Sequence, residues 1–369
     1  MLARLLHHRN LGFRSSWRSA IWARSSSSSS SASESVSGSG NSEVRSDVLI
    51  SGLNADRDIM VRVVACRELL QENMIKNDMS PQAARLFAEV TMGTMMMGCG
   101  MKDEESLQLS LVGSYKDPNG GEEDVVGSIT CITDGSCVVR STLSSAVALC
   151  TTTDMEDVFG KKGTMHVVRQ HPNFKQPVTG SVRMLNTDIA SNLEEYMKIS
   201  EQRSGKFFFD VLVDGALCRH ALAILVEQLP GASDNNIQSV LENLQAVKEH
   251  GLRCYLTGTG DARSELGLVL DTVLGNSVAD VDNVEVGSTT DLIDKKSDAL
   301  RWSMQPEYRC TCSIEKIWRT LKLLPTHEIE DMVTSHRQSC TPLEIKCEFC
   351  GVMYSVGAEE MQSEILASQ

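Results

Sequence analysis

Alternating apolar and polar positions predict a strand-rich region between residue 48 and about residue 230. Residues 60–65 alternate and are rich in valine, as expected of a strand. Ser80 and Pro81 then predict the start of a helix, because serine is a favoured N-cap and proline is tolerated at the first helical position. The stretch 82–98 is rich in alanine and methionine and should be a largely buried helix. Six other short runs have strand character: 107–112, 125–132, 137–141, 164–169, 207–213 and 221–228.

The strands fall in several clusters, with helices placed irregularly between them. This arrangement predicts an α+β domain rather than a regular βαβ array. We assign this N-terminal domain to residues 46–232. The methionines Met92, Met95, Met96, Met97 and Met101 form a soft apolar cluster, for which core packing is the better interpretation than a binding surface.

A helical period replaces the strand pattern between residues 233 and 305. Five apolar residues share one helical face, and Gly251 follows as a C-terminal cap: Ile237, Val240, Leu241, Leu244 and Val247. Residues 261–274 predict a second helix. Seven acidic residues then occur within 271–300, with few large apolar residues. We expect a helical and acidic linker of marginal stability.

The C-terminal segment 306–356 contains two close pairs of cysteines, Cys310/Cys312 and Cys347/Cys350, separated by 34 residues. Structural zinc takes four tetrahedral ligands, commonly as two such pairs. Side chains at i and i+2 of an extended segment point the same way, and Gly351 can take the positive φ that ends a Cys-x-x-Cys turn. Two short helices, 314–324 and 327–336, are predicted between the pairs. A unit of about 50 residues has too small a hydrophobic core to fold without additional stabilisation, such as a bound zinc ion.

Other interpretations of these cysteines remain open, among them four core cysteines without a metal. A redox Cys-x-x-Cys should open a helix, whereas 351–356 resembles a returning strand. His327, His336 and Cys340 are possible replacement ligands, but they lack the paired spacing. Seven scattered cysteines are expected to be small buried hydrophobic residues: Cys66, Cys99, Cys131, Cys137, Cys150, Cys218 and Cys254.

The first 45 residues have a different composition from the rest of the chain. No acidic residue occurs before Glu34, five arginines recur at short intervals, and residues 25–31 are all serine. Such a segment is typical of an organelle transit peptide. The arginines favour targeting to mitochondria. The serine run is also compatible with targeting to a plastid, and a cytoplasmic protein with an untargeted N-terminal tail is the other alternative. At the other end, 357–369 is taken as a C-terminal tail.

Charge and hydropathy exclude several classes of protein. The formal net charge of −14 argues against a nucleic-acid binder that needs a basic face. The longest fully apolar run is far shorter than the roughly 20 residues of a membrane-spanning helix. No glycine-rich nucleotide loop stands between a predicted strand and helix.

The cysteine motifs resemble a known family. Residues 309–313 (Arg-Cys-Thr-Cys-Ser) and 347–354 (Cys-Glu-Phe-Cys-Gly-Val-Met-Tyr) are similar to the zinc motif of the heat-shock protein 33 family, whose members are redox-regulated holdase chaperones. Upstream landmarks of that family follow in order: Ser80-Pro81, Met101-Lys102, 107–109, Gly163-Thr164, 200–202 and 228–232. The resemblance covers about residues 46–356. The longer gap between the pairs and the additional thiol of Cys340 depart from the family pattern.

The resemblance implies a non-enzymatic chaperone that binds unfolded proteins under oxidative stress. It implies one Zn²⁺ per chain, held in the reduced form by Cys310, Cys312, Cys347 and Cys350. Oxidation would join Cys310 to Cys312 and Cys347 to Cys350 and release the metal. A homodimer of the oxidised form and transfer of clients to the heat-shock protein 70 system for refolding are also implied.

Two other classes of function remain alternatives. The first is a static zinc-binding interaction module. The second is a thiol oxidoreductase that uses Cys347 and Cys350.

Overall fold

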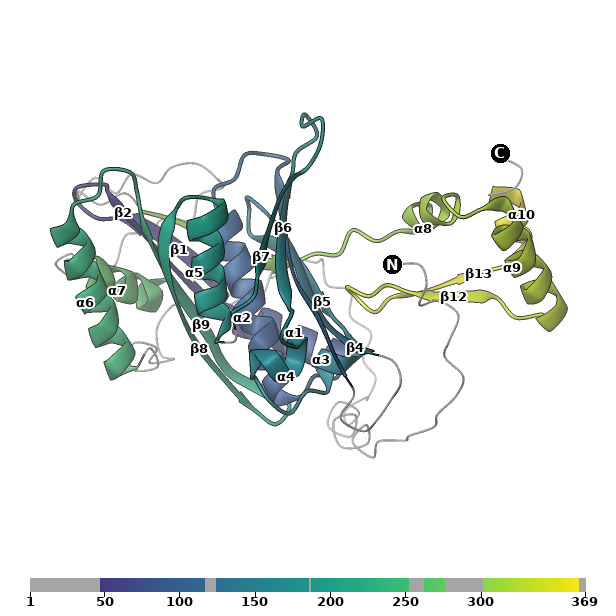
Figure 1. Ribbon diagram of the computed structural model, residues 1–369, viewed down its shortest axis with the longest axis horizontal. Helices are drawn as coiled ribbons and strands as arrows, with labels where there is room; N and C mark the ends of the chain where they lie inside the picture. Colours follow the sequence, from purple (N-terminus) through teal and green to yellow (C-terminus); the bar gives the residue numbers. More distant parts are fainter. Residues whose placement is uncertain (1–46, 117–123, 186, 252–261, 276–300, 365–369) are drawn as a thin grey trace, which may run out of the picture. The chain divides into compact units, whose positions relative to one another are not determined.

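The computed structural model describes residues 47–116, 124–185, 187–251, 262–275 and 301–364 (Figure 1). They form a mixed α+β structure, which confirms the predicted fold class. The predicted transit segment 1–45, the acidic stretch 276–300 and Cys254 lie outside the described residues.

One sheet has five antiparallel strands. Their order is β10 (Arg301–Met304), β1 (Val48–Leu53), β2 (Ile59–Ala65), β9 (Leu217–Gln228) and β8 (Ser204–Asp214). Both faces of β9 are buried. Ala221, Ala223 and Leu225 face one apolar cluster, whereas Leu222, Ile224 and Val226 face another. This two-sided burial explains the continuous apolar run at 221–226.

The second sheet has six strands. Their order is β11 (Glu307–Tyr308), β5 (Val138–Leu143), β4 (Asp124–Asp134), β3 (Ser106–Lys116), β6 (Thr164–Gln170) and β7 (Val178–Arg183). All pairings are antiparallel except that of β11 with β5. The six strands predicted by composition are all present within a few residues of their expected bounds.

Helix α2 (Pro81–Gly98) joins the main core between the two sheets (Figure 1). Ser80 caps it as predicted, since its side chain accepts a hydrogen bond from the backbone N–H of Ala83 at 3.0 Å. Met92, Met95, Met96 and Met97 are buried, which confirms their role in packing. Four further helices surround this core: α1 (Arg67–Asn77), α3 (Ser145–Ala148), α4 (Met155–Phe159) and α5 (Ile189–Ser200).

Helices α6 (Asp234–His250) and α7 (Ala262–Leu274) confirm the two helices predicted after residue 233. Gly251 ends α6 at φ 86°, a conformation that glycine adopts without strain. Both helices cover the face of the five-stranded sheet opposite α2 (Figure 1). Val240, Leu244 and Val247 of α6 pack there, together with Leu266 and Leu270 of α7.

The C-terminal segment has its own small core. Helices α8 (Ile314–Leu321) and α9 (Thr326–Ser339) and the hairpin of β12 (Leu343–Lys346) with β13 (Met353–Val356) occur where predicted. Helix α10 (Ala358–Glu364) was not predicted, and its Met361 is fully buried. The structure therefore differs from the predicted tail at 357–369, because the amphipathic turn around Met361 completes this small core.

The predicted boundary between linker and C-terminal segment also differs from the structure. Strand β10, within the predicted linker, pairs with β1, and β11 pairs with β5. Residues 301–308 therefore belong to the edges of the two sheets. We refer to these eight residues as the edge segment. Among the described residues, no helix is both long and apolar enough to cross a membrane.

Candidate metal centre

Four cysteine sulfurs converge in the C-terminal segment. The Sγ atoms of Cys310, Cys312, Cys347 and Cys350 all lie within 4.8 Å of one another. Sγ of Cys310 is 3.7 Å from that of Cys347, and Sγ of Cys312 is 3.3 Å from that of Cys350. Tetrahedral zinc with bonds of about 2.3 Å requires sulfurs roughly 3.8 Å apart. The four partly buried thiols therefore fit a structural zinc site in both donor chemistry and spacing.

The second cysteine pair lies on the turn between β12 and β13. The backbone N–H of Gly351 donates to the carbonyl of Cys347 at 2.8 Å, and the N–H of Cys347 donates to the carbonyl of Val352 at 2.9 Å. Gly351 has φ 74°, which is the positive φ predicted for it. The strand that follows is β13, not a helix, so the helix-opening geometry of a thioredoxin-like motif is absent from this turn.

The first cysteine pair lies between β11 and α8. Arg140 of β5 donates to Oγ1 of Thr311 at 2.6 Å, and Lys316 of α8 donates to the same oxygen at 2.7 Å. Ser313 caps α8 by accepting from the N–H of Lys316. Side chains on both flanks thus hold the peptide between the two ligands.

The second pair is also bound to the six-stranded sheet. The hydroxyl of Tyr308 donates to the carbonyl oxygen of Phe349, and the hydroxyl of Thr142 donates to the carbonyl oxygen of Glu348 at 2.9 Å. The guanidinium of Arg140 lies 5.2 Å from the centre of the Phe349 ring. The backbone between the two ligands is therefore attached to β5 and β11.

Three of the four thiols have shifted pKa values. Burial opposes ionisation of Cys312, but hydrogen bonds from the Tyr354 hydroxyl, at 3.1 Å, and from neighbouring thiols outweigh it and lower its pKa to about 7. Burial raises the pKa of Cys310. Burial, together with hydrogen bonds among the thiols, raises the pKa of Cys350 to about 12. Cys312 is thus the preferred thiolate of these three, and Tyr354 is a partner of the site that the spacing of cysteines did not indicate.

The other predicted candidates lie apart from this cluster. Cys340 is exposed and ends α9, and His336 pairs through Nδ1 with the carbonyl of Thr341 at 3.0 Å. Neither they nor His327 belongs to the four-cysteine group found among the described residues. Five scattered cysteines are buried, as predicted: Cys66, Cys99, Cys131, Cys137 and Cys218. Cys150 is only half-buried.

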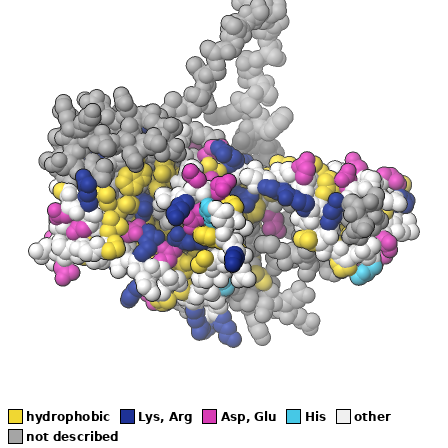
Figure 2. All heavy atoms as spheres, turned by 90° about the horizontal axis from the view of Figure 1, so that it is seen from above, with side chains coloured by type: hydrophobic (Ala, Val, Ile, Leu, Met, Phe, Trp, Pro, Cys, Tyr) yellow, Lys and Arg dark blue, Asp and Glu magenta, His cyan; other side chains and the backbone are white. Residues whose placement is uncertain are grey.

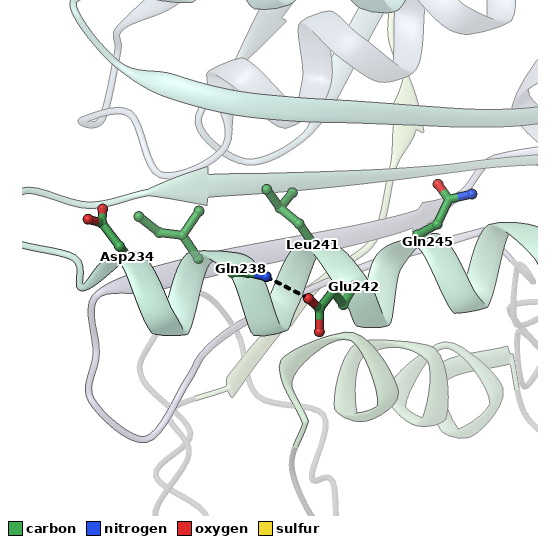
Figure 3. Close-up of a pocket in the computed structure, with 6 residues that line it drawn as sticks. Asp234, Gln238, Leu241, Glu242 and Gln245 are labelled. Carbon is green, nitrogen blue, oxygen red and sulfur yellow. Dashed lines mark hydrogen bonds between the residues drawn. The ribbon is translucent and has the colours of Figure 1, made fainter.

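The face shown in Figure 2 carries mixed charge. On the face shown in Figure 2, Lys and Arg side chains lie among Asp and Glu side chains. A hollow beside α6 is lined by Ile237 and Leu241 together with amides and carboxylates, and Gln238 donates to Glu242 there at 2.9 Å (Figure 3). No cysteine or histidine lines this hollow.

A family model described as Hsp33 protein matches residues 47–357, a range that includes both sheets and all four cysteines. The chain belongs to the Hsp33 family. The 33 kDa chaperonin of Clostridium novyi (strain NT) is 24% identical over 321 residues, covering 86% of this chain and 97% of the relative. That of Staphylococcus haemolyticus is 24% identical over 330 residues, covering 87% and 98%.

The fold of this Hsp33-family chain is similar to a solved one. The crystal structure of the 33 kDa chaperonin from Thermotoga maritima aligns with a TM-score of 0.65 over 88% of this chain and 99% of that chain. The two sequences are 18% identical, so this likeness concerns the fold. The match of the family model over residues 47–357 confirms the family resemblance found in the cysteine motifs.

Proposed function

We propose that this protein is a redox-regulated holdase chaperone that binds unfolding proteins when its four C-terminal cysteines are oxidised. The chaperonin names of its relatives support a chaperone function. The observation that carries the redox part is the cluster of four sulfurs within 4.8 Å, formed by two chain segments that are both attached to the six-stranded sheet. In this proposal the protein binds clients and does not transform them chemically.

Cys310, Cys312, Cys347 and Cys350 would hold one zinc ion. When bound, zinc keeps its ligands as thiolates and contributes about 10–16 kcal/mol of folding free energy in small zinc domains. The segment's own core is small, with Leu321, Ile329, Val333, Val356 and Met361 as its buried residues. Its folded state would therefore depend on the four sulfurs.

Oxidation would remove the ligands in pairs. A thiolate sulfur attacks one oxygen of hydrogen peroxide and the O–O bond breaks. The sulfur becomes a sulfenic acid, while the other oxygen leaves as hydroxide and is protonated to water. The neighbouring thiol then attacks the sulfenic sulfur, the S–O bond breaks with release of a second water, and an S–S bond forms. Following the family resemblance, we propose the pairs Cys310–Cys312 and Cys347–Cys350. Both rings are small, so thiol reductants would reverse the step.

Loss of the folded C-terminal segment would expose apolar surface. The hydrogen bonds of Tyr308 and Thr142 to the cysteine turn would be lost, and the edge segment would lose part of its anchorage. Asp271 of α7 binds Arg301 of β10, so release of β10 would also loosen α7. Beneath α6 and α7 lie six aliphatic side chains of the five-stranded sheet: Ile59, Val61, Val63, Leu222, Ile224 and Val226. An apolar patch of this kind binds other unfolding chains.

Further parts of the proposal come from the family resemblance and the N-terminal composition. We propose a homodimer of the oxidised form, transfer of clients to the heat-shock protein 70 system, and no binding of nucleic acid. Residues 1–45 are proposed to direct the protein to mitochondria, with plastid and cytoplasm as alternatives.

Aggregation of a heat-unfolded client protein, followed by light scattering, tests the proposal. The zinc-loaded full chain should suppress aggregation at near-stoichiometric ratio after peroxide treatment and not before, and a thiol reductant should reverse the effect. Equal suppression in both states would favour the static zinc module. Repeated turnover of a small disulfide substrate without suppression would favour the thiol oxidoreductase.

A further inference from the structure

Three sulfur atoms from distant parts of the chain meet at the edge of the main core. Cys99 follows α2, Cys137 lies in the turn between β4 and β5, and Met304 ends β10. Sδ of Met304 is 3.8 Å from Sγ of Cys99 and 3.5 Å from Sγ of Cys137. The two cysteines are only 5% and 0% exposed. The thioether of the edge segment therefore contacts both buried thiols.

The surroundings of the pair favour one thiolate beside one thiol. A hydrogen bond from Cys137 lowers the pKa of Cys99 to about 6 against the effect of burial, aided by the charge of Arg62 and by Ser51, whose Oγ is 3.9 Å away. The hydrogen bond to Cys99 and burial raise the pKa of Cys137 well above its ordinary value. A thiolate next to a protonated thiol is the arrangement in which a disulfide forms readily.

The side chain of Arg62 and the backbone of Cys137 are two further unusual features around these thiols. The buried Nε of Arg62 has no hydrogen-bond partner within the described ranges, although its NH1 binds Glu227 at 2.8 Å. Cys137 has φ 63°, a left-handed conformation that costs free energy for a residue with a Cβ. Its carbonyl accepts from the N–H of Glu307 in β11 at 3.2 Å. Both strands of the edge segment thus contact the pair.

We propose that Cys99 and Cys137 form a second redox-active dithiol, separate from the four zinc-site cysteines and shielded from oxidant by Met304. The thiolate of Cys99 attacks one oxygen of hydrogen peroxide, the O–O bond breaks, and Cys99 becomes a sulfenic acid while hydroxide leaves and is protonated to water. Cys137 then attacks the sulfenic sulfur, the S–O bond breaks, and the S–S bond forms with release of a second water. The two thiols lose two electrons, which reduce the peroxide.

The existence of the pair does not depend on the proposed chaperone function. Only its timing rests on that function, because displacement of the edge segment would follow unfolding of the C-terminal segment. The pair would then be oxidised after the zinc-site cysteines and not before.

Differential alkylation and mass spectrometry of the full chain test this inference. After peroxide treatment with a zinc chelator present, the peptides of Cys99 and Cys137 should be joined, and joined several-fold more slowly without the chelator. Met304→Ala should speed the reaction without chelator, whereas Met304→Leu, which keeps the cover, should resemble the wild type. Cys131 is the matched internal control. It is also buried, burial raises its pKa to about 11, and it should remain a free thiol.

Two results would overturn the inference. The first is a Cys99 and Cys137 pair that stays reduced after the four zinc-site cysteines have reacted. The second is one equivalent of a thiophilic metal ion retained by a chain with all four zinc-site cysteines replaced by serine, which would reassign the three sulfurs to a metal site. Because the readout is a peptide cross-link, a chain that forms it without suppressing aggregation would contradict only the proposed function.

Discussion

The hydroxyl of Tyr308 donates a hydrogen bond to the carbonyl oxygen of Phe349. Tyr308 belongs to β11, at the edge of the six-stranded sheet, and Phe349 lies between Cys347 and Cys350. One side chain therefore connects the sheet directly to the turn that presents two of the four sulfurs. In the proposed function, this contact would transmit the state of the cysteines to the edge segment.

Replacement of Tyr308 by phenylalanine should weaken that connection. A single neutral hydrogen bond contributes about 0.5–1.5 kcal/mol, so zinc transfer to a competing chelator should accelerate up to roughly tenfold. The measurement is the rate of chelator absorbance change with the zinc-loaded full chain. An unchanged rate would show that the turn holds its metal independently of the sheet.

Replacement of Tyr354 by phenylalanine provides a contrast, because its hydroxyl donates to a ligand sulfur and not to a carbonyl. Loss of the 3.1 Å contact to Sγ of Cys312 concentrates charge on that sulfur and makes it more nucleophilic. Zinc release by peroxide should become faster in this variant, whereas Tyr308→Phe should act mainly on release to the chelator. Identical behaviour of both variants in both assays would contradict separate roles for the two hydroxyls.

The ligand assignment predicts different zinc contents for two serine substitutions. Cys350→Ser removes one of the four clustered sulfurs and should lose most of the zinc affinity. Cys340→Ser is the matched control, because this thiol is exposed at the end of α9 and lies outside the cluster, so about one zinc per chain should remain. Elemental analysis of the purified chains measures both. Zinc lost from Cys340→Ser and kept by Cys350→Ser would refute the assignment.

Asp47 should make stability depend on pH in acid solution. Burial raises its pKa to about 6, while the N–H groups of Glu68 and Leu69 in α1 oppose the shift. The folded state thus holds this proton more tightly than the unfolded state, so stability is lost as pH rises from about 4 to 6. Relative to Asp47→Asn, the wild type should lose about 3 kcal/mol of unfolding free energy across that interval.

Urea unfolding at several pH values measures this difference. Asp103→Asn, the same change at an exposed position, serves as the control, and its slope should match the wild type. Parallel curves for the wild type and Asp47→Asn would show that Asp47 does not hold its proton in the folded chain.

Much of the fold was predictable because its signals are local. The cap at Ser80, the helical face of α6 and the turn at Gly351 each depend on residues within a few positions of one another. Strand β10 was missed because it is very short and its partner β1 lies near the opposite end of the described chain. No local sequence pattern therefore indicates this strand. Helix α5 was missed although Asp188 caps it.

The spacing of the four clustered cysteines was easier to interpret from the sequence than the surroundings of the cluster were. The spacing of the cysteines can be read directly from the sequence, so the four candidate ligands could be predicted from it. The hydroxyls of Tyr308 and Tyr354 and the approach of Met304 to Cys99 and Cys137 depend on tertiary contacts between segments far apart in the chain. Spacing contains no information about such contacts.

The localisation proposal has a separate test. Residues 1–45 fused to a fluorescent reporter should direct it to mitochondria, because the segment is rich in arginine and nearly free of acidic residues. Changing its arginines to glutamine should abolish import. A reporter that stays in the cytosol would contradict the proposal, and one that enters plastids would show that the serine run is decisive.

The central claim is that the four-cysteine site restrains chaperone activity. Its most direct test is client aggregation measured by light scattering with the full-length Cys350→Ser variant under reducing conditions. This variant should suppress aggregation without any oxidant, because three sulfurs cannot keep the C-terminal segment folded. Cys340→Ser and the wild type should not. If reduced Cys350→Ser is as inactive as the wild type although it has lost its zinc, the site does not restrain the chaperone and the account is contradicted.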